Sequence, residues 1–305
     1  MSTTPPPTTS PDRSRPTSTA TATRLRGIRW FLALTFGCSW IPWVLVRAAG
    51  YSLDDPAVQL LTAAFVPALA AIVTRGWITR EGFDDAGLRP RIRQSWPSYA
   101  IALVLPGGVF VLAAAVAAAT GLWNADLHLT RQDVLFAAVA LVIPVVAAPI
   151  FWGEEFGWTA YLRDRLVPGR PVATTFATGL IWGLWHWPLP WVGYFGGGGT
   201  AVDAIVAMLL WLPLSVLLEF VIGWLWARSG SVWPSAIVHG GSNLVVALGL
   251  EHLVDSGAHA VTLLMCVAYV PVVACIVVAQ WRGRAGAVRT APAREFASGD
   301  GGDGT

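Results

Sequence analysis

Long apolar runs dominate this sequence and restrict the folds that it can adopt. Of the 305 residues, 55% are hydrophobic and only 12% are charged. A helix that crosses the hydrocarbon core of a bilayer needs about 20 mostly apolar residues. Eight runs of about this length cover residues 28–47, 57–74, 98–120, 134–158, 172–192, 204–227, 232–250 and 259–281. The pattern predicts an all-α polytopic membrane protein with about eight transmembrane helices.

The arginines predict how these helices are oriented. The chain has no lysine, so all 20 basic residues are arginines. Short loops rich in Arg or Lys face the cytoplasm. If the N-terminus lies inside, only Arg47 and Arg131 fall on the outer side, so we expect an N-in, C-in topology. The net charge of +2 then reflects orientation; the expected surroundings are the lipid bilayer, and no nucleic-acid partner is expected.

The two ends of the chain differ in composition from its middle. Residues 1–25 are rich in Pro, Ser and Thr, and residues 284–305 are also polar. Segments of this kind cannot bury enough apolar surface to fold alone, so both are predicted to be disordered tails. Residues 26–283 form one predicted transmembrane domain, with its core motifs within residues 150–245.

Five ionisable residues lie inside the apolar runs. An ionisable group within a membrane span is costly unless it is paired or faces a polar cavity, so each is a functional candidate. A helix rises about 1.5 Å per residue, which places all five roughly 12 to 18 Å from the cytoplasmic edge. They are Glu154, Glu155, His186, Glu219 and His239. Their shared depth favours a polar cavity that opens to the cytoplasm.

The two histidines have distinctive neighbours. His186 lies in "GLIWGLWHWPLPW", where Gly179 and Gly183 form a small-xxx-small step that permits close helix packing. His239 lies in "SAIVHGGSNLVV", with Asn243 four residues later on the same helix face. Imidazole and carboxylate groups together can bind a divalent metal. Alternatively, a glutamate can act as general base on water while imidazole and amide groups stabilise an oxyanion.

Three motifs, in this order along the chain, resemble those of the CPBP intramembrane proteases, also called ABI or type II CAAX proteases. They are "EEFGWTAYL" starting at Glu154, "WGLWH" ending at His186, and "HGGSN" from His239 to Asn243. The segment "FDDAGLRPR", residues 83–91, is similar to the family's Gly-Leu-Arg loop. The resemblance covers roughly residues 80–250. It implies an intramembrane endopeptidase of the group that includes CAAX prenyl endopeptidases and bacteriocin-processing or bacteriocin-immunity proteins.

The resemblance also implies roles for individual residues. Glu154 would activate the attacking water, with His186 beside it, and Glu155 would support the site. His239 and Asn243 would hold the developing oxyanion or help to place the water. If a divalent metal such as zinc is used, Glu154, His186 and His239 are the expected ligands. Without a metal, no cofactor is expected.

One position departs from the family pattern. The family has an arginine four residues after the second glutamate, and this chain has Thr159 there. Threonine donates one hydrogen bond but supplies no charge, so we expect Glu155 to be protonated or paired elsewhere. Arg163 lies about 12 Å from Glu155 along the helix axis, which is long for a direct pair. Two hypotheses follow: compensation from another span, or reduced activity.

Three residues are candidates for a substrate groove. They are Trp158, Trp182 and Glu219, which lie close to the polar layer in the predicted spans. For the two tryptophans the alternative interpretation is packing. For Glu219 it is a structural hydrogen bond to a backbone or Trp N–H group.

The expected function is hydrolysis of a peptide bond near the cytoplasmic side of the bilayer, with a membrane-associated peptide or protein as substrate. One alternative is a non-catalytic or weakly active protein of the same fold, acting in bacteriocin self-immunity or partner binding; Thr159 supports it. Another is a proton-coupled transporter, because intramembrane Glu and His also build proton relays. The Ala-, Gly- and Arg-rich composition without Lys indicates a GC-rich bacterial genome, so we expect a multi-pass protein of the bacterial inner (plasma) membrane.

Overall fold

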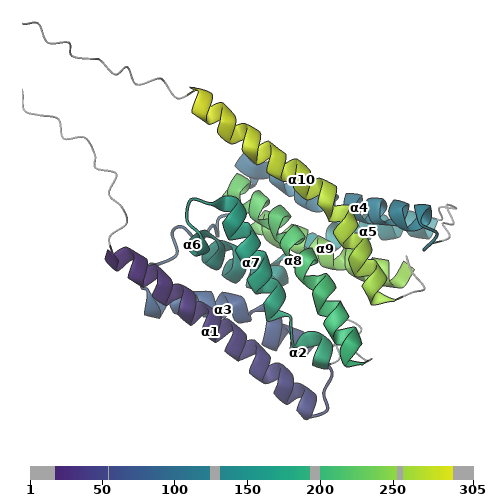
Figure 1. Cartoon of the computed structure of the whole chain (residues 1–305), viewed down its shortest axis with the longest axis horizontal. Coiled ribbons are helices and arrows are strands. Elements are labelled where there is room, and N and C mark those ends of the chain that lie inside the picture. The colour runs from purple at the N-terminus through teal and green to yellow at the C-terminus, as the bar shows by residue number, and fades with distance from the viewer. Residues whose placement is uncertain (1–17, 54, 124–130, 193–199, 253–256, 291–305) are drawn as a thin grey trace, which may run out of the picture.

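The computed structural model describes residues 18–53, 55–123, 131–192, 200–252 and 257–290, and the regular structure in these ranges is helical (Figure 1). The long helices are α1 (Ser18–Ala48), α4 (Ile92–Ala119), α5 (Arg131–Gly157), α8 (Ala201–Ser229), α9 (Val232–His252) and α10 (Ala258–Thr290). The shorter ones are α2 (Pro56–Gln59), α3 (Val66–Val73), α6 (Asp164–Leu166) and α7 (Pro171–Trp185). Three π-helical segments, η1 (Leu60–Ala64), η2 (Thr74–Ile78) and η3 (Trp158–Arg163), and one 3₁₀ segment, η4 (Leu189–Val192), connect them.

The expected all-α polytopic membrane fold is confirmed. Within the described ranges, six helical segments are long and apolar enough to cross a membrane: Thr19–Ala48, Pro56–Ile78, Ile92–Ala119, Ala137–Leu166, Ala201–Ser229 and Ala258–Arg282. The other two predicted runs coincide with α7 and α9, whose apolar stretches are shorter. Each of the eight apolar runs therefore contains a helix. Helix α7 has only 15 residues, and the apolar stretch of α9 is limited to Val232–Leu248.

The predicted helix over residues 172–192 is wrong at its C-terminal end. Helix α7 ends at Trp185, and His186 is its C-cap residue. The sequence that follows contains Pro188 and Pro190, which donate no backbone hydrogen bond and clash with a continuing helix. With 15 residues, α7 is about 22 Å long, less than the hydrocarbon thickness of about 30 Å. His186 is therefore held at a helix end instead of within a continuous span.

The structure also revises the predicted tails. Helix α1 begins at Ser18, so residues 18–25 are helical, and α10 continues to Thr290. The first turns of α1 are anchored, because Arg24 Nη1 donates to the Arg165 carbonyl at 3.0 Å and Arg26 Nη2 donates to the Ile78 carbonyl at 2.7 Å. Residues 1–17 and 291–305 lie outside the described residues.

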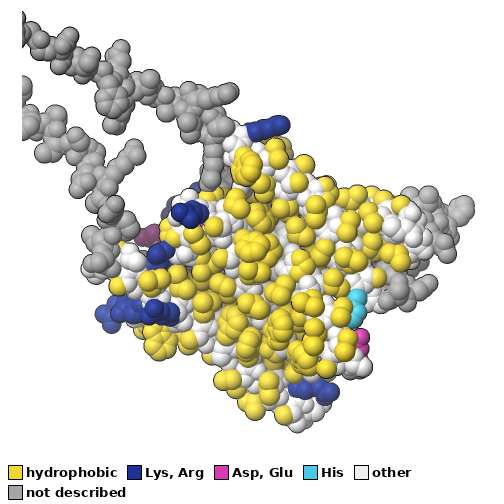
Figure 2. All heavy atoms as spheres, in the orientation of Figure 1, with side chains coloured by type: hydrophobic (Ala, Val, Ile, Leu, Met, Phe, Trp, Pro, Cys, Tyr) yellow, Lys and Arg dark blue, Asp and Glu magenta, His cyan; other side chains and the backbone are white. Residues whose placement is uncertain are grey.

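The surface has the distribution that a bilayer requires. In the face shown in Figure 2, hydrophobic side chains cover the middle, and arginines gather at the ends. The N-terminal end of α1 and the C-terminal end of α10 lie on the same side of the molecule (Figure 1). This arrangement suits the N-in, C-in topology, which stays a prediction.

Glycines bring the central helices into close contact. A Cβ atom on Gly157 of α5 would lie 2.5 to 2.7 Å from atoms of Pro67 in α3, and one on Gly153 would lie 2.8 Å from the Phe65 ring. On α7, a Cβ atom on Gly179 would lie 2.7 Å from Val216 Cα of α8. The predicted small-xxx-small packing of α7 is thus confirmed. Small residues on α5 and α7 permit the same backbone approach that is common between membrane helices.

The loop between η2 and α4 folds back on the helix ends. Arg75 at the end of the second span is fully buried, and its Nη1 donates to Asp85 Oδ1 at 2.6 Å and to the Gly82 carbonyl at 2.8 Å. Gly87 has a φ of +61°, and a Cβ atom there would clash with the Trp226 ring. The loop that includes the "FDDAGLRPR" segment is therefore anchored to the second span and to α8.

Candidate active site

Two adjacent carboxylates stand in the last turn of α5. Glu154 and Glu155 precede Gly157, where the α-helix passes into the π-helical segment η3. Adjacent helix positions point about 100° apart, so the two carboxylates face different neighbours. Glu155 is 1% exposed, whereas Glu154 is only partly buried. Short π-helical segments are frequent at functional sites.

Glu155 is held from two sides. Thr159 Oγ1 donates to its Oε2 at 2.6 Å, and Nδ1 of His239 lies 2.8 Å from its Oε1. His239 is buried and comes from α9, so this contact joins two helices far apart in the sequence. The expectation that Glu155 pairs elsewhere in the absence of the motif arginine agrees with this geometry. Its partners are a hydroxyl on its own helix and an imidazole on another.

Glu154 contacts α7. Its Oε2 accepts a hydrogen bond from Trp182 Nε1 at 3.0 Å. The Trp182 ring is edge-on to both His186 and His239, with centroid separations of 5.3 and 5.1 Å. Trp182 therefore lies between a carboxylate and both imidazoles, and its part in a substrate groove stays a prediction.

The tautomer of His186 follows from its backbone contact. Nδ1 lies 2.8 Å from the Trp182 carbonyl oxygen, which can only accept. Nδ1 therefore carries the proton, and Nε2 is the basic nitrogen of the neutral ring. Trp185 and Trp211 lie edge-on to the imidazole, with centroids at 4.7 and 5.0 Å, so the ring orientation is fixed by packing as well.

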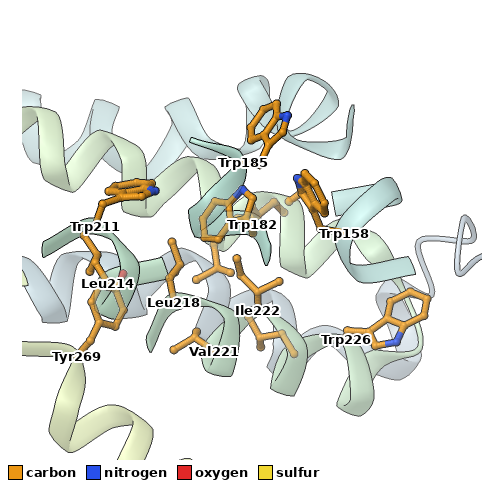
Figure 3. Close-up of a cluster of buried hydrophobic side chains, with 14 of the residues drawn as sticks. Trp158, Trp182, Trp185, Trp211, Leu214, Leu218, Val221, Ile222, Trp226 and Tyr269 are labelled. Carbon is orange, nitrogen blue, oxygen red and sulfur yellow. The ribbon is translucent and has the colours of Figure 1, made fainter. Parts of the chain in front are cut away.

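Aromatic side chains surround the cluster. Figure 3 shows Trp158, Trp182, Trp185 and Trp211 beside aliphatic residues of α8. Trp158 is 1% exposed and packs edge-on against Trp185 at 5.6 Å, so the packing interpretation holds for it. Phe151 was not among the predicted site residues, and its ring centroid lies 4.9 Å from that of His239. Its position one turn before Glu155 on α5 is the only sequence signal that could have indicated it.

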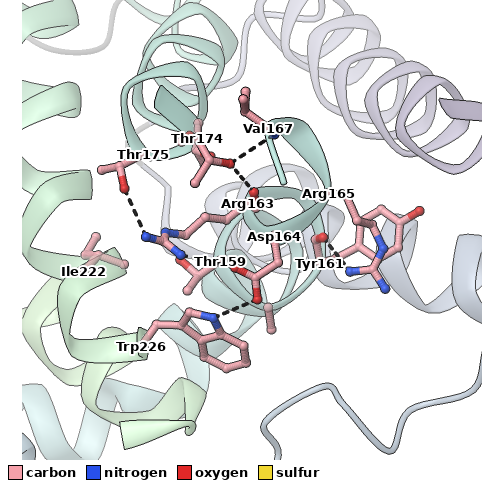
Figure 4. Close-up of polar contacts among 12 residues, drawn as sticks. Thr159, Tyr161, Arg163, Asp164, Arg165, Val167, Thr174, Thr175, Ile222 and Trp226 are labelled. Atoms are coloured by element: carbon pink, nitrogen blue, oxygen red, sulfur yellow. Dashed lines mark hydrogen bonds and ion pairs between the residues drawn. The ribbon is translucent and has the colours of Figure 1, made fainter. Parts of the chain in front are cut away.

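Glu219 is not at the centre of this cluster but beside it. Its carboxylate is 1% exposed, and Oε1 lies 3.6 Å from Arg163 Nε. The guanidinium also donates from Nη2 to Thr175 Oγ1 at 3.0 Å (Figure 4). The structural partner of Glu219 is thus an arginine and not the expected Trp or backbone N–H group. Arg163 is correctly excluded as a direct partner of Glu155.

Asn243 is placed differently from the other candidates. It lies one turn beyond His239 on α9 and is exposed, whereas His239 is buried. Residues four apart share a helix face, so this face runs from the buried cluster to the molecular surface. The role of Asn243 in the site stays a prediction.

The expected metal ligands do not form a metal-binding group. Among the residues that the structure describes, no set of three or more His, Cys, Asp or Glu side chains is arranged to hold a metal ion. Glu154 accepts from Trp182, and His239 faces Glu155. These contacts use one atom of each side chain, Glu154 Oε2 and His239 Nδ1. The use of a metal stays a prediction, and no step below is assigned to one.

The fold and this geometry define a polytopic membrane protein with a buried carboxylate–imidazole cluster contributed by α5, α7 and α9. Residues 131–245 match the family described as type II CAAX prenyl endopeptidase Rce1-like. The matched segment contains all three motifs, and the match confirms the predicted family resemblance. No curated protein matches the chain.

Proposed function

We propose that the protein is an intramembrane endopeptidase that hydrolyses a peptide bond near the cytoplasmic side of a bacterial inner membrane. One observation carries the proposal: two adjacent carboxylates on α5 lie beside two imidazoles. Glu154 accepts from Trp182, whose ring packs against His186. Glu155 contacts His239 directly. The family match supports this activity at the level of the family. A membrane-associated peptide or protein is the proposed substrate.

Glu154 is the proposed general base. It is the less buried of the two carboxylates, so water and substrate can reach it more readily than Glu155. Trp182 Nε1 donates to Oε2 and so fixes the carboxylate with Oε1 directed elsewhere. In the proposed step Glu154 takes a proton from water, the water oxygen attacks the carbonyl carbon, and the same proton passes to the leaving amine as the C–N bond breaks.

The Glu155–His239 pair is proposed to stabilise the oxyanion. With Thr159 donating to one oxygen, the carboxylate of Glu155 can accept from His239 Nδ1 at the other. A carboxylate in this position orients the imidazole and stabilises its protonated form, as in hydrolytic triads. The second ring nitrogen can then donate to the developing negative charge. His186, whose ring is fixed by Trp182, would stand on the other side of the reacting carbonyl.

Asn243 is proposed to contact the substrate as it enters. Its exposed amide lies on the face of α9 that leads to His239. An amide both donates and accepts hydrogen bonds, which suits recognition of a peptide backbone.

A cleavage assay tests the proposal. Purified wild-type protein, Glu154→Gln and His186→Ala are reconstituted in liposomes with membrane-tethered peptides, and products are followed by mass spectrometry. We expect cleavage by the wild type and a loss of about 10² to 10⁴ in rate for Glu154→Gln, the range of a general base. Glu81→Gln, which changes a carboxylate in the loop outside the cluster, is the matched control. Equal rates for all variants would refute the mechanism.

The same preparation tests the remaining alternatives. Folded wild-type protein that binds but never cleaves peptides would favour the non-catalytic function, and proton-driven uptake of a solute would favour a transporter. Metal analysis of the purified protein, with activity measured before and after chelation, tests the metal-dependent alternative. We expect a rate that is unchanged by chelation.

A further inference from the structure

We propose that Arg163, paired with Glu219, is a positioning residue that replaces the arginine missing from the glutamate motif. The inference rests on the proposed function, because its main readout is peptide cleavage. Arg163 does not touch the reacting groups. It acts by holding the helix that carries Glu154 and Glu155 against α7 and α8.

The guanidinium of Arg163 joins three helical segments within the buried region. It is 4% exposed and belongs to η3, which continues α5. Nη2 donates to Thr175 on α7 at 3.0 Å, and Nε lies 3.6 Å from Glu219 on α8. Nη1 donates to the neighbouring Asp164 at 3.1 Å. The Arg163 carbonyl also accepts from Thr174 Oγ1. Backbone and side chain at one residue therefore fix the distance from η3 to α7.

The fold makes room for this side chain. Gly223 lies four residues after Glu219, on the same face of α8. A Cβ atom there would clash with Arg163 Nε and would lie 3.0 Å from Cζ. Any larger residue at 223 would displace the guanidinium. The buried guanidinium, its acidic partner Glu219 and the space left by Gly223 together hold Arg163 in one defined position.

The link from Arg163 to the carboxylates is short. Thr159, which donates to Glu155 Oε2, lies one turn before Arg163, and Figure 4 shows its side chain beside the guanidinium. Thr175 lies on the same helix as Trp182, the donor to Glu154. Arg163 thus connects the segments that bring Glu154, Glu155 and Trp182 together.

The first experiment compares Arg163→Leu with Arg228→Leu in the liposome cleavage assay. Arg228 is exposed on α8 and lies over the Trp224 ring, so it is a matched control. Because a displacement of about 1 Å at a catalytic group can cost up to about 100-fold in rate, we expect Arg163→Leu to lower kcat by about 10- to 100-fold with KM little changed. Arg228→Leu should match the wild type.

Rescue separates positioning from general stability. We expect the double variant Thr159→Arg with Arg163→Leu to regain most of the lost kcat, since the charge then occupies the family's position. Thr159→Arg alone should not raise activity, because Arg163 already pairs with Glu219 and Asp164. Gly223→Ala should reproduce the loss of Arg163→Leu, and Arg163→Lys should fall between that variant and the wild type.

Two outcomes would overturn the proposal. The first is a kcat of Arg163→Leu or Gly223→Ala that equals that of the wild type. The second is a sharp rise in kcat for Thr159→Arg alone. If Arg163→Leu does not fold, Gly223→Ala and Arg163→Lys provide the same comparison. If the wild type itself does not cleave, the proposed function fails, and a double-mutant cycle of melting temperatures between Arg163 and Glu219 then decides whether the pair couples. If the changes in melting temperature of the Arg163 and Glu219 single variants add up to the change of the double variant, the two residues are not coupled and the pair is refuted.

Discussion

At the scale of single residues, Thr159 supplies one of the two hydrogen-bond partners of Glu155, the second glutamate of the motif. Its hydroxyl donates to Glu155 at 2.6 Å, while His239 occupies the other carboxylate oxygen at 2.8 Å. A buried hydrogen bond to a charged group is worth about 1.5 to 3 kcal/mol. The Thr159 hydroxyl therefore supplies part of the stabilisation that an arginine would give to Glu155, without adding a positive charge.

Replacing Thr159 by Val tests this contact. Valine keeps the shape of the side chain and removes the donor, so Glu155 loses one of its two partners. We expect a fall of about 10-fold in kcat for peptide cleavage, equivalent to about 1.4 kcal/mol. The control is Thr178→Val, because Thr178 is also buried but donates only to the Thr174 carbonyl on its own helix. Equal rates for the two variants would contradict the role assigned to Thr159.

Much of the candidate site could be predicted from single residues, and the reasons are physical. An ionisable group in an apolar run needs a partner or a polar cavity, so Glu154, Glu155, His186 and His239 stood out without a structure. The pairing of Glu155 with His239 could not be predicted, because depth along a helix does not specify direction around it. Arg163 was excluded as a partner of Glu155 on axial distance, and its contact with Glu219 depends on how α8 packs.

At the scale of helices, the close packing of α5 on α3 sets the position of the carboxylates. Gly153 and Gly157 flank Glu154 and Glu155 and face the preceding span. The small-xxx-small spacing thus places one face of α5 against α3 and leaves the carboxylate side for α7 and α9. Helix contacts of this kind need small residues on the touching face.

Replacing Gly157 by Ala tests this packing. The added methyl group would lie 2.5 to 2.7 Å from Pro67, which forces the helices apart. We expect a destabilisation of about 1 to 3 kcal/mol, measured as a lower melting temperature in detergent, together with slower cleavage. Gly108→Ala on α4 is the control, since no heavy atom lies within 4 Å of its added Cβ. A melting temperature for Gly157→Ala as high as that of Gly108→Ala would show that the contact is loose.

Helix ends were less predictable than helix positions. The apolar run at residues 172–192 continues through two prolines, and composition alone could not show that α7 stops at Trp185. Mean hydropathy is an average over the whole run, whereas a single proline, which lacks the backbone N–H group, can end the helix. His186 therefore stands at a helix end, where its Nδ1 reaches the Trp182 carbonyl.

At the scale of the whole molecule, charge is gathered at the membrane boundaries. Asp85 lies in the loop that follows the second span, and it pairs with the buried Arg75 at 2.6 Å. Burial tends to raise the pKa of Asp85, but the hydrogen bond and charge of Arg75, with the charge of Arg165, lower this pKa below its ordinary value. The pair attaches the loop to the membrane domain at neutral pH.

The pH dependence of this pair has a defined sign. Because the pKa of Asp85 is lower in the folded state, its contribution to stability is present above the unfolded pKa and disappears as pH falls through the folded one. We expect Asp85→Asn to lower the melting temperature at pH 7 and to approach the wild type at strongly acidic pH. Since the carboxylate is 69% exposed, the effect is small, about 0 to 1 kcal/mol. Asp84→Asn, next to it and exposed, should match the wild type at both pH values.

The orientation of the molecule in the bilayer is a separate prediction. Arginine positions predict that both termini lie in the cytoplasm, and the N-terminal end of α1 and the C-terminal end of α10 lie on the same side of the molecule. Epitope tags at each terminus should be digested by protease in inside-out vesicles and protected in right-side-out vesicles. Tags with opposite accessibility would require an odd number of spans and would contradict the N-in, C-in topology.

The central claim is that Glu154 activates water for peptide-bond hydrolysis inside the membrane domain. The most direct measurement is the initial rate of cleavage of one membrane-tethered peptide by the wild type and by Glu154→Gln, in the same liposomes and at matched folded fraction. If Glu154 is the general base, the wild type cleaves about 10² to 10⁴ times faster than Glu154→Gln. Cleavage by Glu154→Gln at the wild-type rate would contradict it.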